Sequence, residues 1–466
     1  MNLLFCFLLV LLICQSCAPN TILQTNNGIT SLKNPINKII NDSGYDISIG
    51  IKIVALNTGK TLYELNSNKL FTPASNNKLF TLGAALHYLR KDHIFTTSIF
   101  RDGKNLILKG GGDPDLSIAQ IDSLAYYSSN VIDTIDTLFL DASLMDSAYF
   151  GNGWMWDEGP WWYAAPVSAL SLNDNCIDFI IKPGDIGEPA NIQTYPTTDY
   201  ISTLNNSLTI QPNQNIKKIS IERDWTNQKN HFTITGPIQY DAAYDTLKRN
   251  IKNPTLFAGT IFRELLNKYG IMINQIAMTS TTKSTNPIAT NKSKRLLHSA
   301  QNMMNESDNL TAELFVKKIG LTNHQQGNWK NGLHNIKIFL NDSVGIDTTL
   351  IRIADGSGLS RYNLTTASEI TTFLEWIFNS PYKNDFISCL TTGGMKKGTM
   401  EDRLNIAGDM IRVKTGGLSG VTNISGYIFS PRYGPIAFSI LTSGYIGDSN
   451  PYRSLQDKII QHTINE

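Results

Sequence analysis

The sequence has little charge and almost no surplus of either sign. Charged residues make up 17% of the 466 residues, and the formal net charge is +1 at pH 7. It contains no basic run and no basic helix with interleaved aromatic residues, which are the usual features of nucleic-acid binding. We therefore expect no nucleic acid among its partners. The 41% of hydrophobic residues instead indicate a folded protein with a large core.

Metal-binding patterns and cysteines are also scarce. The seven histidines show no ligand spacing and no His-Glu-x-x-His motif, so we expect no metal and no cofactor. Of the five cysteines, Cys176 and Cys389 are the two that lie beyond the N-terminal leader. These two could form a disulfide, but distant lone cysteines are more often two buried thiols.

The N-terminus alone carries a long apolar run. Residues 3–13 are almost entirely apolar, but they are too few for an ordinary membrane-spanning helix. They fit the central region of a secretory signal, and Cys17 resembles a bacterial lipoprotein processing site. We predict a signal peptide over residues 1–17 and an exported, periplasmic protein that touches a membrane only through this signal or a lipid on Cys17. A plain cleaved signal and an uncleaved anchor remain alternatives.

The order of strand and helix patterns predicts an α+β fold that is split by an insertion. Residues 46–56 and 61–65 predict a hairpin near the start of the chain. Three strands are predicted at the end of the chain, at 409–414, 424–430 and 436–442. We expect these five strands to form one antiparallel sheet flanked by helices, because the links between the last strands are too short for crossovers.

A Ser-x-x-Lys motif lies where a loop turns into a helix, at residues 71–86. Ser75 and Lys78 are three apart and share a helix face, as a serine nucleophile and its lysine base require. A capping serine followed by a solvated lysine is the common alternative for a single match. The motif recurs at Ser280 and Ser380, but a polar linker surrounds the first and a proline follows the second.

Two further motifs, Ser-x-Asn and Lys-Thr-Gly, follow along the chain. Each motif alone is weak evidence, but the three together indicate one kind of active site. Ser307 and Asn309 form Ser-x-Asn in a break between two amphipathic helices. Lys414 opens a Lys-Thr-Gly motif at the end of an alternating strand. The order Ser-x-x-Lys, Ser-x-Asn, Lys-Thr-Gly is typical of penicillin-binding proteins and class A β-lactamases.

Acyl transfer explains why these residue types occur together. Ser75 is the expected nucleophile, and Lys78 must be neutral to take its proton. A neighbouring cation lowers a lysine pKa, and Lys414 could be that cation. We expect Ser307 to bridge Lys78 and the leaving amine and to relay the proton, and Asn309 to donate to a peptide carbonyl of the substrate.

The Lys-Thr-Gly strand is expected to bind the substrate itself. Lys414 and Thr415 would bind its terminal carboxylate. Gly416 and Gly417 would let the strand edge approach the substrate backbone. The backbone N–H groups of Ser75 and Gly417 would form the oxyanion hole.

The motif spacing resembles the D-alanyl-D-alanine carboxypeptidase family of class C low-molecular-mass penicillin-binding proteins, peptidase family S13. That family carries accessory domains in the interval that corresponds to the long stretch between Ser75 and Ser307. The resemblance covers essentially all of the mature chain. Further matching segments are Lys109-Gly-Gly-Gly-Asp-Pro114, Gly153-Trp-Met-Trp156 followed by Ala165-Pro166, Asp355-Gly-Ser-Gly-Leu-Ser-Arg361, and Gly398-Thr399 ahead of Arg403.

The resemblance implies a penicillin-binding/β-lactamase-like transpeptidase domain. Its catalytic part would comprise residues 18–97 and 283–466. The accessory region would span 98–282, with an inner insertion at about 123–195. The implied activity is that of a serine D,D-carboxypeptidase, often also a D,D-endopeptidase, which acts on peptidoglycan stem peptides and is acylated by β-lactams.

Recognition of the substrate side chain is also implied by the resemblance. Glu158, Tyr163 and Arg361 match the positions that recognise diaminopimelate in the family. This sequence departs from the family pattern in two places: Glu158 lengthens the usual Asp, and Ser419 stands where a longer polar residue can occur. A surface carboxylate is the alternative interpretation of Glu158.

Three alternatives stay open. A β-lactamase shares the motifs, but no Glu can be assigned as its water activator and the long insertion argues against it. A catalytically inactive, peptidoglycan-binding lipoprotein is the non-enzymatic alternative, and the intact motifs argue against it. The aromatic block of residues 154–163 is more often a core patch, although it could also form a wall against which a ligand lies.

Overall fold

The computed structural model describes residues 26–132, 134–212, 218–280, 286–322 and 324–466. The predicted signal peptide over residues 1–17 and the predicted lipid site at Cys17 lie outside these residues. Within the described ranges, no helix is both long enough and apolar enough to cross a membrane.

A six-stranded antiparallel sheet joins the two ends of the chain. Its strand order is β1-β3-β2-β17-β16-β15. Strand β2 pairs with β17 in a continuous register that sets Ala55 opposite Ile436 and Ser48 opposite Ser443. The prediction that the first hairpin and the last three strands share one sheet is confirmed. The strands are β1 (Asn26–Gly28), β2 (Ser48–Ala55), β3 (Lys60–Leu65), β15 (Ile411–Leu418), β16 (Val421–Ser430) and β17 (Gly434–Ser443).

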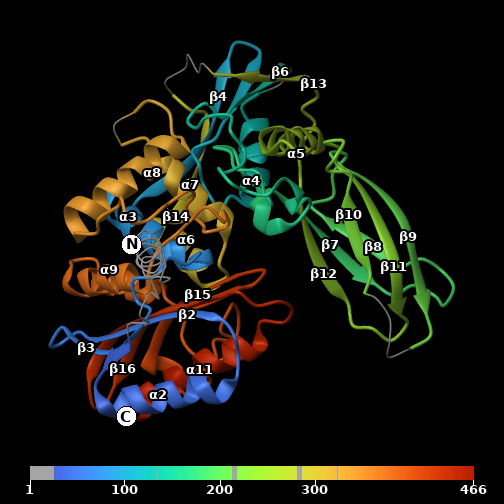
Figure 1. The fold of residues 1–466 in the computed structure, drawn as a ribbon. Coiled ribbons are helices and arrows are strands. Elements are labelled where there is room, and N and C mark those ends of the chain that lie inside the picture. Colours follow the sequence, from blue (N-terminus) through green and yellow to red (C-terminus); the bar gives the residue numbers. More distant parts are fainter. Residues whose placement is uncertain (1–25, 133, 213–217, 281–285, 323) are drawn as a thin grey trace, which may run out of the picture.

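Helices cover both faces of this sheet (Figure 1). On one face, α2 (Thr30–Ser43) and α11 (Asn450–Asn465) bury Leu32 and Ile459 against the strands. On the other face, α9 contacts β2 and β17, and a helical layer behind it packs around Phe80 and Phe315. The α+β class is therefore as predicted. The helices on this face are α3 (Lys78–Tyr88), α6 (Leu296–Asn305), α7 (Asn309–Ile319), α8 (Trp329–Ile338), α9 (Ala367–Asn379) and α10 (Lys383–Cys389).

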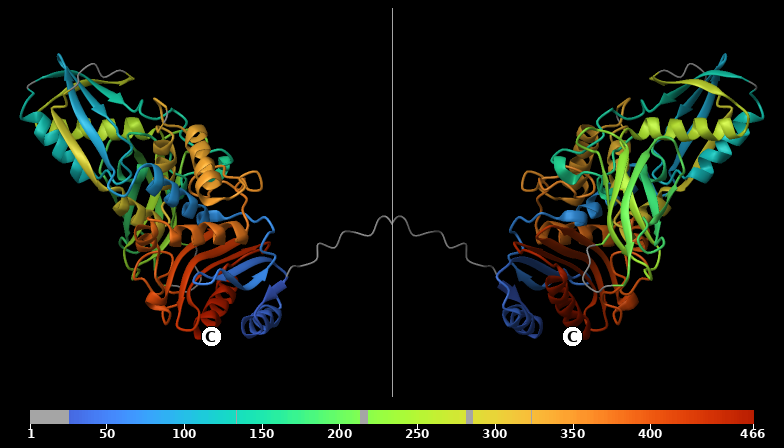
Figure 2. Two further views of the ribbon diagram at one scale, coloured as in Figure 1. Left: turned by 90° about the vertical axis from the view of Figure 1, so that its left-hand side faces the viewer. Right: turned by 90° about the vertical axis from the view of Figure 1, so that its right-hand side faces the viewer.

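The residues between α3 and α6 form an elongated second part that extends away from the six-stranded sheet (Figure 2). It contains a five-stranded sheet, β13-β6-β5-β4-β14, and two three-stranded sheets, β10-β11-β9 and β12-β7-β8. A separate core, which includes Leu138, Phe179 and Phe257, holds this part together. The elements are β4 (Ile94–Asp102), β5 (Asn105–Lys109), α4 (Ile118–Ser129), β6 (Ile135–Asp141), β7 (Cys176–Lys182), β8 (Asn191–Tyr195), β9 (Ser202–Ile210), β10 (Ser220–Arg223), β11 (His231–Gln239), β12 (Asp245–Asn250), α5 (Pro254–Lys268), β13 (Ile273–Thr279) and β14 (Ala289–Arg295).

Strand pairing bears on where the inserted parts begin and end. Strand β6 falls inside the predicted inner insertion of about 123–195, yet it pairs with β5 and β13 in the five-stranded sheet. The two small sheets are formed by residues 176–250. The division into a catalytic part (18–97 and 283–466) and an inserted part (98–282) remains our proposal. Its first boundary falls within β4, and β14, which lies after residue 283, pairs with β4 in the five-stranded sheet.

Cys176 and Cys389 are two separate buried thiols. Neither takes part in a disulfide, and neither side chain is exposed. Burial raises the pKa of Cys176 well above its ordinary value and raises the pKa of Cys389 to about 12. Both groups are therefore thiols at neutral pH, which answers the question that the sequence left open.

We expect both thiols to resist alkylation in the folded protein, because the reactive thiolate is scarce and the sulfur is covered. Peptide-resolved mass spectrometry after iodoacetamide treatment should find less than about a tenth of each residue labelled. Unfolding in guanidinium should make both fully reactive. Rapid native labelling of either cysteine would contradict its burial.

Candidate active site

Ser75 lies on a short 3₁₀ turn, η1 (Ala74–Asn77), that leads directly into α3. Residues three apart eclipse one another in such a turn, so the Ser75 and Lys78 side chains stand together. Their Oγ and Nζ atoms are 3.0 Å apart. Ala74 adopts the left-handed conformation with φ 47°. Gly358 packs so closely on this turn that a Cβ there would overlap the Ala74 carbonyl.

Lys78 is fully buried, and its amine makes three hydrogen bonds. Nζ lies 2.6 Å from Asn309 Oδ1, 2.9 Å from the Ser357 carbonyl and 3.0 Å from Ser75 Oγ. The first two partners can only accept, whereas the Ser75 hydroxyl can also donate. A neutral amine has two N–H bonds and one lone pair. In the ammonium form the third N–H donates to Ser75 Oγ. In the neutral form the two carbonyl oxygens can take both N–H bonds, which leaves the lone pair for the Ser75 proton.

The pKa of Lys78 is lowered to about 8, and the main cause is burial. The negative charges of Asp308, Glu313 and Asp355 act in the opposite direction. The sequence suggested the charge of Lys414 as a possible cause of the lowering, whereas burial is the main cause. Burial, followed by the charge of Lys78, lowers the pKa of Lys414 well below its ordinary value.

Ser307 contacts Lys414, whereas the sequence prediction placed it against Lys78. Lys414 Nζ donates to Ser307 Oγ over 3.0 Å and to the Thr415 carbonyl over 2.8 Å. Ser307 has a left-handed backbone with φ 61°, just before α7 begins at Asn309. Non-glycine residues held in this conformation are strained, and such strain concentrates at functional sites.

Asn309 is fixed by two hydrogen bonds on opposite sides of its amide. Its Oδ1 accepts from Lys78, and its Nδ2 donates to the Tyr163 carbonyl over 2.8 Å. The Nδ2 group carries a second N–H bond, so the predicted donation to a substrate carbonyl stays a prediction. In this arrangement Asn309 orients Lys78 and ties α7 to the aromatic segment.

The Lys-Thr-Gly strand β15 packs against the turn that carries Ser75. A Cβ on Gly416 would lie 2.7 Å from the Pro73 carbonyl, whereas a Cβ on Gly417 would meet nothing within 4 Å. Gly416 is therefore required by the protein's own chain, and Gly417 borders open space. Asn423 on β16 strengthens the same contact by donating to the carbonyls of Thr72 and Pro73 over 3.0 and 2.8 Å.

A buried carboxylate, Glu313, supports the loop that binds Lys78. It accepts from the backbone N–H groups of Gly356 and Ser357, at 2.9 and 2.7 Å, and from Trp329 Nε1 at 2.7 Å. The carbonyl of Ser357 is one of the two acceptors of Lys78. Burial and the charge of Asp355 raise the pKa of Glu313 to about 7. Glu313 therefore positions an acceptor of the proposed base.

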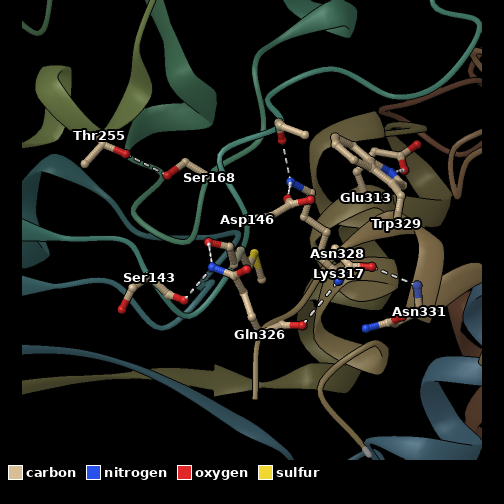
Figure 3. A network of polar contacts seen from close by, with 12 residues as sticks. Ser143, Asp146, Ser168, Thr255, Glu313, Lys317, Gln326, Asn328, Trp329 and Asn331 are labelled. Atoms are coloured by element: carbon tan, nitrogen blue, oxygen red, sulfur yellow. Dashed lines mark hydrogen bonds and ion pairs between the residues drawn. The ribbon is translucent and has the colours of Figure 1, made fainter. Parts of the chain in front are cut away.

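The same network reaches the inserted part of the chain (Figure 3). The fully buried Lys317 lies one turn after Glu313 on α7, and its Nζ is 3.9 Å from the centre of the Trp329 ring. It pairs with Asp146 over 2.7 Å and also donates to the Ala148 carbonyl. A continuous set of contacts thus runs from Asp146 through Trp329 and Glu313 to the loop beside Lys78.

Sequence patterns alone did not identify Glu313, Ser357 or Asn423. Ser357 lies inside the Asp355–Arg361 segment that was matched to the family, so a signal for it was present. Glu313 follows Asn309 by four residues and so shares its helix face. It interrupts a stretch that is otherwise largely apolar, but a lone charge on a helix is also the mark of a solvated face.

Ser75 and most of the other predicted site residues line a cleft of about 870 Å³. Lys78 and Lys414 are fully buried beneath it. Among the residues that the structure describes, no group of three or more His, Cys, Asp or Glu side chains could hold a metal ion. The predicted site residues that line the cleft are Ser75, Glu158, Tyr163, Ser307, Asn309, Arg361, Thr415, Gly416 and Gly417.

The aromatic segment forms a wall of the cleft, and the interpretation as a core patch is wrong for its exposed tryptophans. Trp162 is 40% exposed and lines the cleft, as does Tyr163. Burial and a hydrogen bond with Glu158 raise the pKa of the Tyr163 hydroxyl. Arg361 donates to the Ser419 carbonyl over 3.0 Å. These groups lie along one boundary of the cleft.

Comparisons with known proteins agree with this arrangement. The model of the D-Ala-D-Ala carboxypeptidase 3 (S13) family matches residues 32–464. The chain is 29% identical over 446 residues to the D-alanyl-D-alanine carboxypeptidase of Actinomadura sp. (strain R39), covering 90% of this chain and 82% of that protein. It is 26% identical over 376 residues to D-alanyl-D-alanine carboxypeptidase DacB of Haemophilus influenzae, covering 75% of this chain and 76% of that protein.

A solved structure shares the fold. The crystal structure of penicillin binding protein 4 (dacB) from Haemophilus influenzae superposes with a TM-score of 0.79 at 23% identity. The match covers 92% of this chain and 99% of that chain. The inserted part of the chain is therefore included in the likeness.

Replacing Glu313 with Gln should weaken acylation. The amide keeps the size of the carboxylate but cannot accept from Trp329 and from both backbone N–H groups at once, so the loop holding the Ser357 carbonyl should shift. A misplacement of about 1 Å can cost roughly a hundredfold in rate, and we expect a loss of about ten- to a hundredfold in the rate of penicillin acylation.

The pH profile separates this positioning role from a general loss of fold. Removing the charge of Glu313 removes one influence that raises the pKa of Lys78, so the midpoint of the acidic limb should move to lower pH. Stopped-flow acylation at several pH values measures both effects. An unchanged rate and midpoint would show that Glu313 does not act on Lys78.

Proposed function

Because the chain belongs to the D-Ala-D-Ala carboxypeptidase 3 (S13) family and is thereby a serine hydrolase, we propose that it releases the terminal D-Ala of peptidoglycan stem peptides through an acyl-enzyme on Ser75. One observation carries this proposal. The Lys78 amine has two strict acceptors and one hydroxyl around it, so its lone pair is held against the nucleophile. That arrangement serves proton abstraction from Ser75 and has no evident structural purpose.

Acylation begins when Lys78 Nζ takes the Ser75 proton. The Ser75 oxygen attacks the carbonyl carbon of the penultimate D-Ala, and negative charge develops on the carbonyl oxygen. The backbone N–H groups of Ser75 and Gly417 are the proposed donors to that oxygen. Gly417 borders open space in the cleft, which leaves room for the tetrahedral intermediate.

The leaving amine then requires a proton. Ser307 is the proposed relay, because its hydroxyl receives a hydrogen bond from Lys414 and lies at the cleft surface. Ser307 gives its proton to the amine and takes one from Lys414, and Lys414 in turn recovers the proton that Lys78 took from Ser75. The C–N bond breaks as the amine is protonated, D-Ala departs, and Lys78 is neutral again. In the second half of the reaction, Lys78 activates a water that hydrolyses the ester and regenerates Ser75.

The terminal carboxylate of the substrate would be held next to the Lys-Thr-Gly strand. Thr415 lines the cleft, and Lys414 lies buried behind it. Glu158, Tyr163 and Arg361 also line the cleft, and they are proposed to contact the side chain of the third stem residue. Their mixture of charges suits a side chain that carries both an amine and a carboxylate.

We also propose D,D-endopeptidase activity. The cleft continues past the reactive centre along residues 398–403 and 450–457. A free D-Ala would occupy little of this space, whereas a cross-linked leaving strand would use it. Such substrates lie outside the cytoplasm, which agrees with the proposed export and periplasmic location. A lipid anchor on Cys17 remains part of this proposal.

Fluorescent penicillin should form a covalent adduct with the wild-type protein and none with Ser75→Ala. A β-lactam carries an acyl group that matches the proposed donor and reacts with the same oxygen. The measurement is in-gel fluorescence followed by peptide mapping of the adduct. Equal labelling of Ser75→Ala would refute the mechanism.

Rapid turnover of a chromogenic cephalosporin would favour a β-lactamase, and adduct formation without D-Ala release from a pentapeptide would favour an inactive binder.

The acylation rate should rise with pH and level off above a midpoint near 8. Lys78 has its pKa lowered to about 8, and the base is protonated and inactive below this value. Each pH unit well below the midpoint should therefore lower the rate about tenfold. Benzylpenicillin acylation between about pH 6 and about pH 10, which is about 2 units to either side of the midpoint, measures the profile. A rate that stays constant across this range would argue against Lys78 as the base.

A further inference from the structure

A second cavity, of about 520 Å³, adjoins the active-site cleft. Met155 and Glu158 line both spaces, so a single short segment separates them. The second cavity is also bounded by a segment of the inserted part at the end of strand β10 and just after it, and by Lys252 and Asn253. The residues of that segment are Arg223, Trp225, Thr226 and Gln228. The cavity therefore lies where the inserted part meets the aromatic wall of the cleft.

Aromatic rings form much of its lining. Trp156 is 80% exposed, and its ring centre lies 5.2 Å from that of Trp225. Phe150 and Trp154 form a second ring pair with centres 6.2 Å apart. Large aromatic side chains are seldom left this exposed unless they contact a ligand or a partner. These rings offer a surface for the apolar part of a bound molecule.

The cavity also contains a buried cation that lacks a counter-ion. Arg223 is 8% exposed and donates to Asn250 Oδ1 over 3.1 Å and, more weakly, to the Lys229 carbonyl over 3.3 Å. Its Nε has no acceptor, and no ion pair of Arg223 occurs within the described ranges. Burial lowers the pKa of Arg223 to about 10, against the opposing influence of Tyr200 and Asp224. A buried guanidinium is stabilised by an anion that accepts from it.

A second cation lies at the rim. Lys252 is exposed and, in the part of the chain that the structure describes, has no ion-pair partner. Glu158 is the one carboxylate among the residues that line the cavity, and it is engaged with Tyr163 on the side of the cleft. Cations therefore outnumber anions in this space, which favours a negatively charged ligand.

We propose that this cavity is a second substrate subsite, which binds a carboxylate-bearing segment of the stem peptide upstream of the third residue. The inference rests on the proposed function, in which Glu158 contacts the third residue. A peptide chain that continues upstream from there meets the wall shared by the two spaces. The aromatic rings would cover its apolar parts, and Arg223 and Lys252 would bind a free carboxylate such as the α-carboxylate of a γ-linked D-glutamyl residue.

Two peptides that differ in one group test the proposal. Both end in D-Ala-D-Ala and carry a γ-linked D-glutamyl residue before the third position, one with a free α-carboxylate and the other with an α-amide. The wild-type protein should release D-Ala from the acid with about tenfold higher kcat/KM, since an ion pair of this kind is typically worth about one power of ten. The difference should appear in KM.

Variants of the cavity residues test whether the preference for the acid peptide over the amide peptide arises in this cavity. Lys252→Ala and Arg223→Gln should each reduce the acid-to-amide ratio towards one, and Lys252→Arg should retain it. Lys182→Ala, which removes an exposed charge of the inserted part outside both cavities, is the matched control and should keep the wild-type ratio. Because Arg223 is buried, thermal melting must accompany that variant, and Lys252→Ala decides the question if Arg223→Gln unfolds.

The outcomes separate this inference from the function on which it rests. Equal kcat/KM for the two peptides in the wild type, or an unchanged ratio in Lys252→Ala, would overturn the second subsite while leaving the carboxypeptidase intact. Release of D-Ala from neither peptide would overturn both proposals.

Discussion

The fixed orientation of one buried amine is the constraint on which this structure depends. Lys78 can act as a base only if its two N–H bonds have acceptors elsewhere, and Asn309 Oδ1 and the Ser357 carbonyl supply them. Asn309 begins α7, whereas Ser357 lies in a loop that is itself held by Glu313 from that helix. One helix therefore sets both acceptors. The cost of burying the amine lowers its pKa and makes the neutral form accessible near neutral pH.

Two lysines share this buried region, and their separation of roles follows from their partners. Lys78 faces Ser75, and Lys414 faces Ser307. Each lysine thus has its own hydroxyl, one that loses a proton and one that can deliver it. Burial, and after it the repulsion by the charge of Lys78, lowers the pKa of Lys414. The pair can then hold one proton more readily than two, as a proton relay requires.

The sequence was most informative where a pattern is local. The hairpin at 46–56 and 61–65 and the turn-to-helix at Ser75 were predicted because alternation and helix periodicity are carried by neighbouring residues. Strands β13 and β14 overlap the region that was interpreted as a linker. They are the two edge strands of their sheet and bury few side chains, so the alternating pattern that marks a strand is weak. Whether Ser307 contacts Lys78 or Lys414 depends on how distant segments pack in the folded chain, and no local sequence pattern contains that information.

The insertion joins the rest of the chain through two strands, β4 and β14, that are hydrogen-bonded to each other. Its two connections therefore emerge side by side, and its length has no direct effect on the spacing between Ser75 and Lys414. A chain organised in this way can gain or lose accessory elements during evolution while its reaction chemistry stays the same. The contact between Lys317 and Asp146 sets a limit on that freedom, because any replacement insertion would have to provide a partner for the same buried cation.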